Sequence, residues 1–334
     1  MRFIDLFVGA TAFTGAVAAP KKATKKRQSA FEFTGVNESG AEFGNTALPG
    51  QLDKDYTWPV ESAISTFIQK GFNTFRIPIM MERVIPDELT GTVNETYVQG
   101  LDSIVEYITG QDAFAVIDPH NFGRYYDEII TDVEGFGAWW TTVATRYASN
   151  EKVIFDVNNE FHDEDNTVVA NLNQAAIDAI RAAGATTQTI FVEGNSWTGA
   201  WHWTSSGTAD GMGQLTDPED KIVYEMHQYL DSDGSGTSTE CVSGTIGAER
   251  LADATAWLKA NGKKGLIGET AGGSNAQCIE ALQGMFSHMQ ENSDVWAGWL
   301  WWGGGPWWGD YMYGIEPPSG TAYTGVLPSI EEFI

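Results

Sequence analysis

Short runs rich in β-branched and aromatic residues alternate with longer amphipathic runs from Phe31 onward. The clearest amphipathic run, 166–184, places Val169, Leu172 and Ile180 near one helical face and ends at a glycine, which is a stop signal. The other predicted helices are 60–70, 94–109, 134–148, 245–262 and 275–292. The predicted strands are 31–36, 73–79, 113–118, 152–157, 189–194, 221–226, 264–269 and 295–302.

This alternation of strands and helices predicts a closed (β/α)8 barrel, that is, a TIM barrel, in a single domain. The chain has 334 residues, of which 42% are hydrophobic, enough for one large core. A doubly wound open sheet is the alternative architecture, but no glycine-rich phosphate loop follows the first predicted strand. A barrel would place the functional residues at the carboxyl ends of its strands.

The N-terminus has the pattern of a secretory signal. Arg2 precedes a mostly apolar stretch that ends in the small-residue pattern Ala16-Val17-Ala18. The basic segment that follows ends in the pair Lys26-Arg27, which resembles a processing site of fungal secreted enzymes. We therefore expect a signal peptide at 1–19, a propeptide at 20–27, a mature domain at 28–334 and secretion out of the cell. The alternative is a membrane anchor, but no later run of 18 or more apolar residues occurs.

The formal net charge of −26 narrows the choice of partners. Such a charge repels nucleic acid and anionic membranes, and it suits a neutral, sugar-like substrate better than an anionic one. We expect neither a nucleic-acid partner nor a membrane partner, and a monomer by default.

The two cysteines, Cys241 and Cys278, are expected to form a disulfide in an oxidising compartment. Two cysteines and five scattered histidines give no zinc-type spacing, so we expect no metal and no cofactor. Two sequences match the N-glycosylation acceptor pattern. Asn94 lies on a predicted surface loop, whereas Asn37 lies beside a strand expected to carry the site and should be unmodified.

Polar, titratable and aromatic residues lie at or near the ends of the predicted strands. They are Asn37, Arg76, His120, Asn121, Asn159, Glu160, His227, Tyr229, Glu269 and Trp302. Each alone could be a surface ion pair, a core histidine or a packing residue, and a single isolated glutamate would most simply pair with Arg76. In a barrel, however, these strand ends meet at one rim, and strands four and seven bring Glu160 and Glu269 to opposite sides of it. Two such carboxyl groups are what glycosidic bond cleavage requires.

The segment VIFDVNNEFHD (153–163) closely resembles the signature of glycoside hydrolase family 5, in which Asn-Glu follows the fourth strand of a (β/α)8 barrel. The likeness continues through TFRIPI (74–79), DPHNFGRYY (118–126), YEMHQYLDSDGSGT (224–237) and LIGETAGG (266–273). It spans nearly all of 31–318 and is specific to fungal secreted endo-β-1,4-glucanases within the family. Phe161, where the family often has proline, and Thr270, where relatives often carry a larger apolar residue, depart from the pattern.

The resemblance implies Glu160 as general acid/base, Glu269 as nucleophile and Asn159 as a donor to the sugar 2-hydroxyl, in a retaining double displacement on β-1,4-glucan. Arg76, next to Glu269, should favour the ionised nucleophile. The supporting residues would be Arg76, His120, Asn121, His227, Tyr229 and Asn37. Trp302 offers a flat face for the sugar at the cleavage point, and Trp58, Trp201 and Trp307 are further platforms.

Three rival functions can be weighed from the sequence. An endo-β-1,4-mannanase would use the same fold and the same two glutamates, but the motifs favour glucan. A non-catalytic polysaccharide-binding barrel would need the aromatic residues without the glutamates. A metal-dependent hydrolase would need a ligand pattern such as HExxH, which does not occur.

Overall fold

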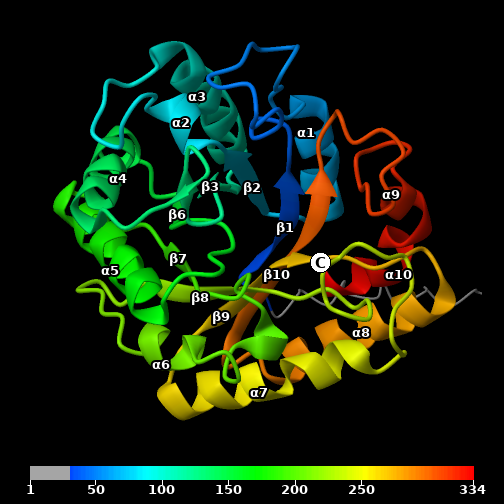
Figure 1. Cartoon of the computed structure of the whole chain (residues 1–334). Coiled ribbons are helices and arrows are strands. Elements are labelled where there is room, and N and C mark those ends of the chain that lie inside the picture. The colour runs from blue at the N-terminus through cyan, green and yellow to red at the C-terminus, as the bar shows by residue number, and fades with distance from the viewer. Residues whose placement is uncertain (1–30) are drawn as a thin grey trace, which may run out of the picture.

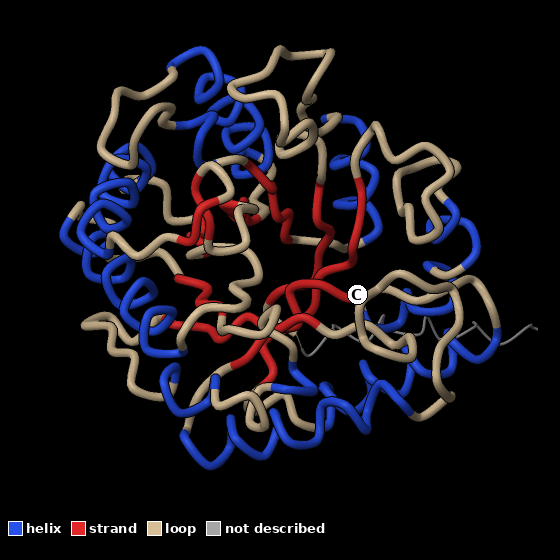
Figure 2. The backbone as a smooth tube through the Cα atoms, viewed as in Figure 1, coloured by secondary structure: helices blue, strands red, loops and turns tan. Residues whose placement is uncertain are grey.

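Eight parallel strands close into a barrel in the computed structural model, which describes residues 31–334. The order around the barrel is β1-β10-β9-β8-β7-β6-β3-β2, and Figures 1 and 2 show these strands at the centre of a ring of helices. The strands are β1 (Phe33–Glu38), β2 (Thr74–Ile79), β3 (Phe114–Pro119), β6 (Val153–Asp156), β7 (Ile190–Glu193), β8 (Ile222–His227), β9 (Gly265–Thr270) and β10 (Trp296–Gly304). The predicted TIM barrel is confirmed. The predicted signal peptide and propeptide lie outside the described residues.

Six longer helices match the six predicted ones to within about two residues. They are α1 (Glu61–Lys70), α3 (Glu95–Gly110), α4 (Val133–Tyr147), α5 (Asn166–Ala182), α7 (Ile246–Asn261) and α8 (Ala276–Glu291). Side-chain caps fix several starts; for example, Asp132 accepts a hydrogen bond from the backbone N–H of Gly135 at α4. Gly71 ends α1 in the left-handed conformation that glycine adopts most readily.

Several short elements were not predicted from the sequence, because each is too short to display a helical or strand period. They are α2 (Met81–Val84), the hairpin of β4 (Arg124–Tyr125) and β5 (Glu128–Ile129), η1 (Ala200–His202), α6 (Thr208–Met212), α9 (Thr321–Gly325), α10 (Leu327–Ile330) and η2 (Glu331–Phe333). The hairpin and η1 lie in loops that follow strands on the functional rim, so they shape the surroundings of the site.

The interior of the barrel is layered. An apolar layer fills its lower part with Phe33, Val116, Ile154, Phe191, Val223, Leu266, Ala297 and Leu300. Side chains on one face of a strand recur every second residue. Two positions further along four of these strands stand Asp118, Asp156, Glu193 and Glu225, which are all fully buried. A carboxyl layer therefore lies on the apolar layer, toward the carboxyl ends of the strands.

The main core lies between the barrel and the helices. As predicted, Trp139, Trp140 and Trp296 are packing residues there, and Trp257 packs against the same core from α7. The predicted disulfide joins Cys241, in the loop after β8, to Cys278 in the first turn of α8. Within residues 31–334, no helix combines the length and the apolar character needed to cross a bilayer.

Candidate active site

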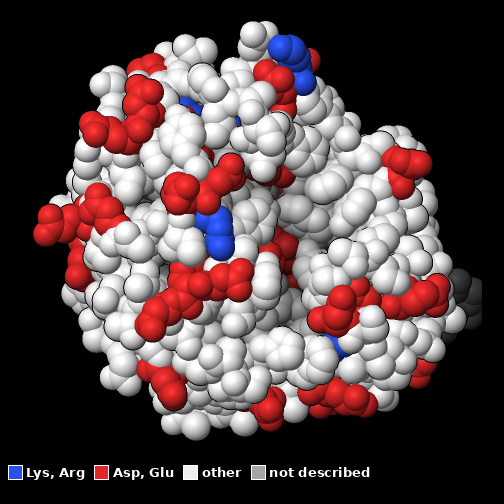
Figure 3. Space-filling model, in the orientation of Figure 1, with Lys and Arg blue, Asp and Glu red and all other residues white. Residues whose placement is uncertain are grey.

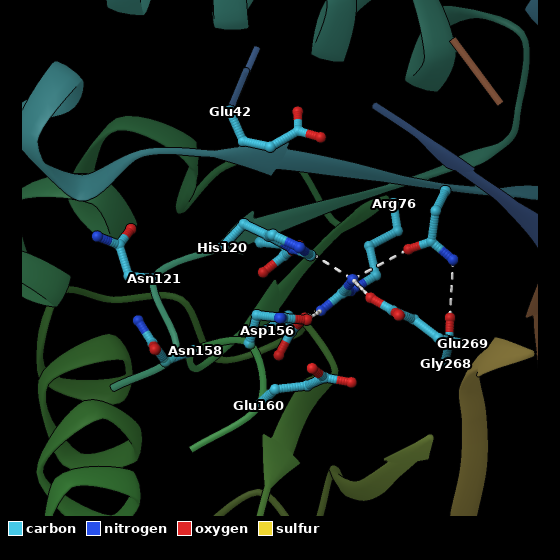
Figure 4. Close-up of polar contacts among 12 residues, drawn as sticks. Glu42, Arg76, His120, Asn121, Asp156, Asn158, Glu160, Gly268 and Glu269 are labelled. Atoms are coloured by element: carbon cyan, nitrogen blue, oxygen red, sulfur yellow. Dashed lines mark hydrogen bonds and ion pairs between the residues drawn. The ribbon is translucent and has the colours of Figure 1, made fainter. Parts of the chain in front are cut away.

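Arg76, in the middle of β2, is the centre of the polar network (Figure 4). Its Nη1 donates to Oε1 of Glu269 at 3.0 Å and to Oδ1 of Asn37 at 3.0 Å, and its Nη2 donates to Oδ1 of Asn159 at 2.8 Å. The carboxyl layer surrounds the same guanidinium, with oxygens of Asp118 at 3.0 Å, Asp156 at 2.8 Å, Glu193 at 3.0 Å and Glu225 at 3.2 Å. Burial opposes the charge of Arg76, but these carboxylates outweigh burial and raise its pKa.

Glu160 and Glu269 approach each other from different strands. Glu269 is in β9, and Glu160 lies in the loop after β6 with a left-handed φ of 50°. A carboxylate oxygen of Glu160 and one of Glu269 lie within 4.8 Å of each other. Retaining glycosidases hold their two carboxyl groups about 5–5.5 Å apart, whereas inverting enzymes need about 6.5–9.5 Å to admit a water. The observed spacing fits the retaining arrangement.

His227 and Tyr229 hold the two glutamates in place. His227 Nδ1 is 2.7 Å from Oε1 of Glu160 and 3.6 Å from Oε2 of Glu269. The hydroxyl of Tyr229 donates to Oε2 of Glu269 at 2.7 Å, as the sequence suggested. Burial lowers the pKa of His227, but Glu269 and Glu193 outweigh it and raise the pKa well above its ordinary value. The surrounding carboxyl groups therefore favour the protonated form of His227.

The pKa of Glu269 is raised, chiefly because the side chain is buried. His227 and Arg76 lower this pKa and Glu160 raises it, but burial outweighs the positive neighbours. Arg76 acts as predicted, yet desolvation in the barrel is the larger effect.

Asn159 offers an unused donor. Arg76 holds its Oδ1, while its buried Nδ2 has no hydrogen-bond partner among the residues that the structure describes. A buried N–H without a partner is costly, so it is expected to be satisfied by a ligand or by water. This fits the role predicted for Asn159 toward a sugar hydroxyl.

The remaining predicted residues divide between framework and cleft. Asn37 is buried and donates to the backbone oxygens of Gly268 and Trp301, so it ties β1 to β9 and β10 and is not accessible for glycosylation. Asn121 accepts from the backbone N–H of Met81 and donates to Glu82, so its polar atoms are used within the protein.

His120 and Trp302 lie on the cleft side. His120 pairs with Asp118 at 2.8 Å, and its ring stacks on Trp302 with centroids 5.3 Å apart and planes 8° apart. Asn94, the other glycosylation candidate, is partly buried and caps α3 through a hydrogen bond from Tyr97.

Two hollows open on either side of this centre. The larger, of about 370 Å³, is lined by Glu160, Trp197, Trp201, His227 and Tyr229 among others. The second, of about 330 Å³, is lined by His120, Phe122, Trp302, Trp308 and Phe43 among others. The space-filling view of this face shows a central depression with acidic atoms at its floor (Figure 3). Glu160 lines the first hollow, and His120, whose charge acts on Glu269, lines the second, so both hollows lie beside the glutamate pair.

The three outer tryptophans predicted as platforms lie in different surroundings. Trp201 lines the larger hollow, but its ring also stacks on His202 and lies 4.2 Å from the guanidinium of Arg250. Trp58 packs against Tyr97 of α3, 5.0 Å between ring centroids, and lines neither hollow. Trp307 is 41% exposed and lines neither hollow. The geometry therefore supports only Trp201 of the three as a platform.

Trp197 is a site residue that the sequence analysis missed. It is 51% exposed, lines the larger hollow and stacks on His162 with centroids 4.6 Å apart. The turn Ser196–Thr198 presents it, with φ values of 57°, 55° and 45°. Three consecutive left-handed residues without a glycine have no simple sequence signal, so the direction of this side chain could not be predicted.

The carboxyl layer was also missed, although a signal for it existed. Asp156, Glu193 and Glu225 each interrupt a largely apolar predicted strand, and Asp118 ends one. Charged residues are rarely buried without a partner. Gly268 makes room for this layer, because a Cβ there would lie 1.7 Å from Oε1 of Glu225.

Among residues 31–334, two groups of three side chains are close enough to hold a metal ion: Glu160, His227 and Glu269, and Glu193, Glu225 and His227. Arg76 lies within 3.2 Å of an oxygen of Glu193, Glu225 and Glu269. A guanidinium in that position already supplies the positive charge and would repel a cation. These groups are better suited to sharing protons and hydrogen bonds.

Comparisons with known proteins agree on one family. The family model described as cellulase (glycosyl hydrolase family 5) matches residues 36–305. The chain is 56% identical to endo-beta-1,4-glucanase B of Aspergillus niger and 54% identical to endo-beta-1,4-glucanase B of Emericella nidulans, in each case over 100% of both chains.

Solved structures give the same result. XacCel5A, in a complex with cellopentaose, superposes with a TM-score of 0.88 at 35% identity, covering 91% of this chain and 100% of that one. Cel5A (EG2) from Hypocrea jecorina (Trichoderma reesei) gives a TM-score of 0.81 at 28% identity over 90% of this chain and 98% of that one.

Proposed function

The chain belongs to the cellulase family, glycosyl hydrolase family 5, and is an endo-β-1,4-glucanase; we propose that Glu160 and Glu269 carry out its chemistry by a retaining double displacement. The observation that carries this assignment is the close approach of the two carboxylates, within 4.8 Å, across an open cleft.

In the first step, Glu269 attacks the anomeric carbon while Glu160 gives a proton to the departing glycosidic oxygen. Arg76 and Tyr229 each donate to a different oxygen of Glu269, so the carboxylate is oriented before substrate arrives. The bond between the anomeric carbon and the leaving oxygen breaks, and the sugar becomes bonded to Glu269.

In the second step, Glu160 removes a proton from water as the water attacks the same carbon, and Glu269 leaves with its original charge. In the free enzyme His227 is hydrogen-bonded to Glu160 at 2.7 Å, and we expect it to keep this contact through both steps. The free Nδ2 of Asn159 donates to the 2-hydroxyl of the reacting sugar. No cofactor is needed, because protonation and covalent capture supply the chemistry.

The open cleft explains internal cleavage. A polysaccharide can occupy hollows on both sides of the glutamate pair, so the enzyme does not need a chain end. Because the acid must face the departing sugar, the hollow that Glu160 lines should hold the leaving side, and the hollow with Trp302 and His120 should hold the other side. The cellopentaose bound by XacCel5A supports a β-1,4-linked glucan oligosaccharide as the ligand.

We further propose that the enzyme is secreted as a monomer. The disulfide between Cys241 and Cys278 supports an oxidising compartment. Mass spectrometry of enzyme secreted from a fungal host would give the mature N-terminus, expected at Gln28.

The assignment is tested by product stereochemistry and by labelling. Proton NMR of early cellopentaose digests should show the β-anomer first, and a 2-deoxy-2-fluoro-β-cellobioside should label the peptide that contains Glu269. Both Glu160→Gln and Glu269→Gln should lose at least about a hundredfold in activity on carboxymethylcellulose, whereas the exposed Glu128→Gln should not. An α-anomer formed first, or label on another residue, would overturn the mechanism. A preference for galactomannan over carboxymethylcellulose would argue for a mannanase.

A further inference from the structure

Glu193, the last residue of β7, binds the main chain of Glu160. Its Oε2 accepts a 2.7 Å hydrogen bond from the backbone N–H of Glu160, and its Oε1 accepts a 3.0 Å hydrogen bond from Nη2 of Arg76. The Glu193 side chain is fully buried. One carboxyl group thus connects the backbone of the proposed acid/base to the arginine that contacts the proposed nucleophile.

Glu160 needs this support because of its backbone conformation. Its φ of 50° is left-handed, a conformation that is unfavourable for a residue with a side chain. Such conformations persist where the surroundings fix them, and they gather at functional sites. Here the N–H of Asn159 donates to the oxygen of Pro119 at 3.0 Å, and the oxygen of Phe161 accepts from Trp197 at 3.0 Å. Glu193 supplies the acceptor for the amide between them.

The two oxygens of Glu193 have different partners, and both act as acceptors. Burial raises the pKa of Glu193 to about 8, against the opposing effect of His227 and Arg76. His227 Nε2 lies 3.8 Å from Oε1, and Glu225 faces Glu193 from the neighbouring strand β8. A glutamine at this position would turn one N–H toward either Arg76 or the Glu160 amide. An aspartate would keep the carboxyl group but lose the reach to both partners.

We propose that Glu193 is a positioning residue for the first step of the reaction. By fixing the Glu160 amide to Arg76, it directs the Glu160 carboxyl toward the leaving oxygen. It does not touch substrate, because it lies buried below the cleft. The inference rests on the proposed function, since it requires Glu160 to be the general acid. Loss of the hydrogen bond between Glu193 and the Glu160 amide should displace the Glu160 carboxyl group. A shift of about 1 Å can lower the rate of a reaction about a hundredfold.

The dependence of kcat/KM on the leaving group distinguishes a positioning role for Glu193 from a general disturbance of the site. Cleavage of cellopentaose needs a proton on the leaving oxygen, whereas the phenolate of 2,4-dinitrophenyl β-cellobioside leaves without one. Glu193→Gln and Glu193→Asp should therefore lose at least about tenfold more kcat/KM on cellopentaose than on the dinitrophenyl substrate. Asp156→Asn is the matched control, because Asp156 contacts Arg76 at 2.8 Å but has no hydrogen bond to Glu160. It should lower both rates to a similar degree.

Glu160→Ala is measured in parallel to separate the two hypotheses. If Glu160→Ala shows no leaving-group dependence, the proposed function fails. Glu160→Ala can show leaving-group dependence while the Glu193 variants lose kcat/KM equally on both substrates, or lose none. In that case only the positioning role is overturned. Thermal unfolding checks that each variant is folded, and Glu193→Asp, which retains a carboxyl group, carries the test if Glu193→Gln does not fold.

Discussion

The hydroxyl of Tyr229 and the guanidinium of Arg76 bind opposite oxygens of Glu269, at 2.7 Å and 3.0 Å. Neither oxygen can rotate without losing a donor. Arg76 in β2 and Tyr229 in the loop after β8 therefore fix the orientation of the proposed nucleophile.

Tyr229→Phe should lower kcat/KM on cellopentaose about ten- to a hundredfold, because a hydrogen bond to a charged group contributes roughly 1.5–3 kcal/mol. Steady-state kinetics would measure this loss. Tyr313→Phe is the control: its ring stacks on Tyr229, but its hydroxyl donates to the backbone oxygen of Ser238. Equal losses in the two variants would mean that the Tyr229 hydroxyl has no special role.

Trp197→Ala should raise KM for cellopentaose about three- to tenfold and change kcat little. The exposed ring offers an apolar face in the larger hollow, and a stacking contact contributes roughly 0.5–1.5 kcal/mol. Trp307→Ala serves as the control, since Trp307 is similarly exposed but lines neither hollow. If Trp307→Ala alone raised KM, the bound glucan would not follow a path through the two hollows.

Glu38 should make the protein less stable as pH rises. Burial and the nearby Glu316 raise the pKa of Glu38 well above its ordinary value. The folded state therefore binds this proton more tightly than the unfolded state, and stability falls as pH rises above the unfolded value of about 4.3. Glu38→Gln, which stays neutral, should raise Tm at pH 7 by about 2 °C or more and change it little at pH 4.

Calorimetry at both pH values would measure the effect of Glu38→Gln. The exposed Glu128→Gln should leave Tm nearly unchanged at each pH. The same shift at pH 4 and pH 7 would show that the substitution acts through packing rather than through the proton.

Breaking the disulfide should destabilise the loop after β8. The double variant Cys241→Ser, Cys278→Ser is expected to lose about 2–5 kcal/mol of unfolding free energy and about 5 °C or more in Tm. Thermal unfolding with and without reductant tests this. Reductant should lower the Tm of the wild type and leave the double variant unchanged; a fall in the double variant would mean that reductant acts elsewhere.

The fold was predictable because every barrel strand carries its own local pattern. Runs such as TFRIPI and KVIFDV are β-rich and short, and each is followed within the chain by a helical period. The hairpin β4–β5 and helix α6 were not predictable, since a few residues cannot show a period and form in response to their surroundings.

The candidate site was predictable where residues follow strand ends, as Glu160, His227 and Glu269 do. The position of a residue along the chain is easier to predict than the direction of its side chain. Trp58 was expected in the cleft but packs on Tyr97, because a loop residue can turn either way. Glu193 was read as part of a strand, and its contact with Glu160 depends on two strands that meet only in the barrel.

The layering of the barrel places buried carboxyl groups beneath the reacting groups, whereas aromatic residues line the open hollows. Asp118, Asp156 and Glu225 reach the reacting groups from beneath, through Arg76 and His227, and are screened from solvent by protein on every side. Directed evolution confined to these three positions should therefore yield enzymes with a moved pH optimum and unchanged substrate preference. Libraries at the aromatic residues of the hollows should do the reverse. The pH optimum and the substrate preference should therefore be open to engineering separately.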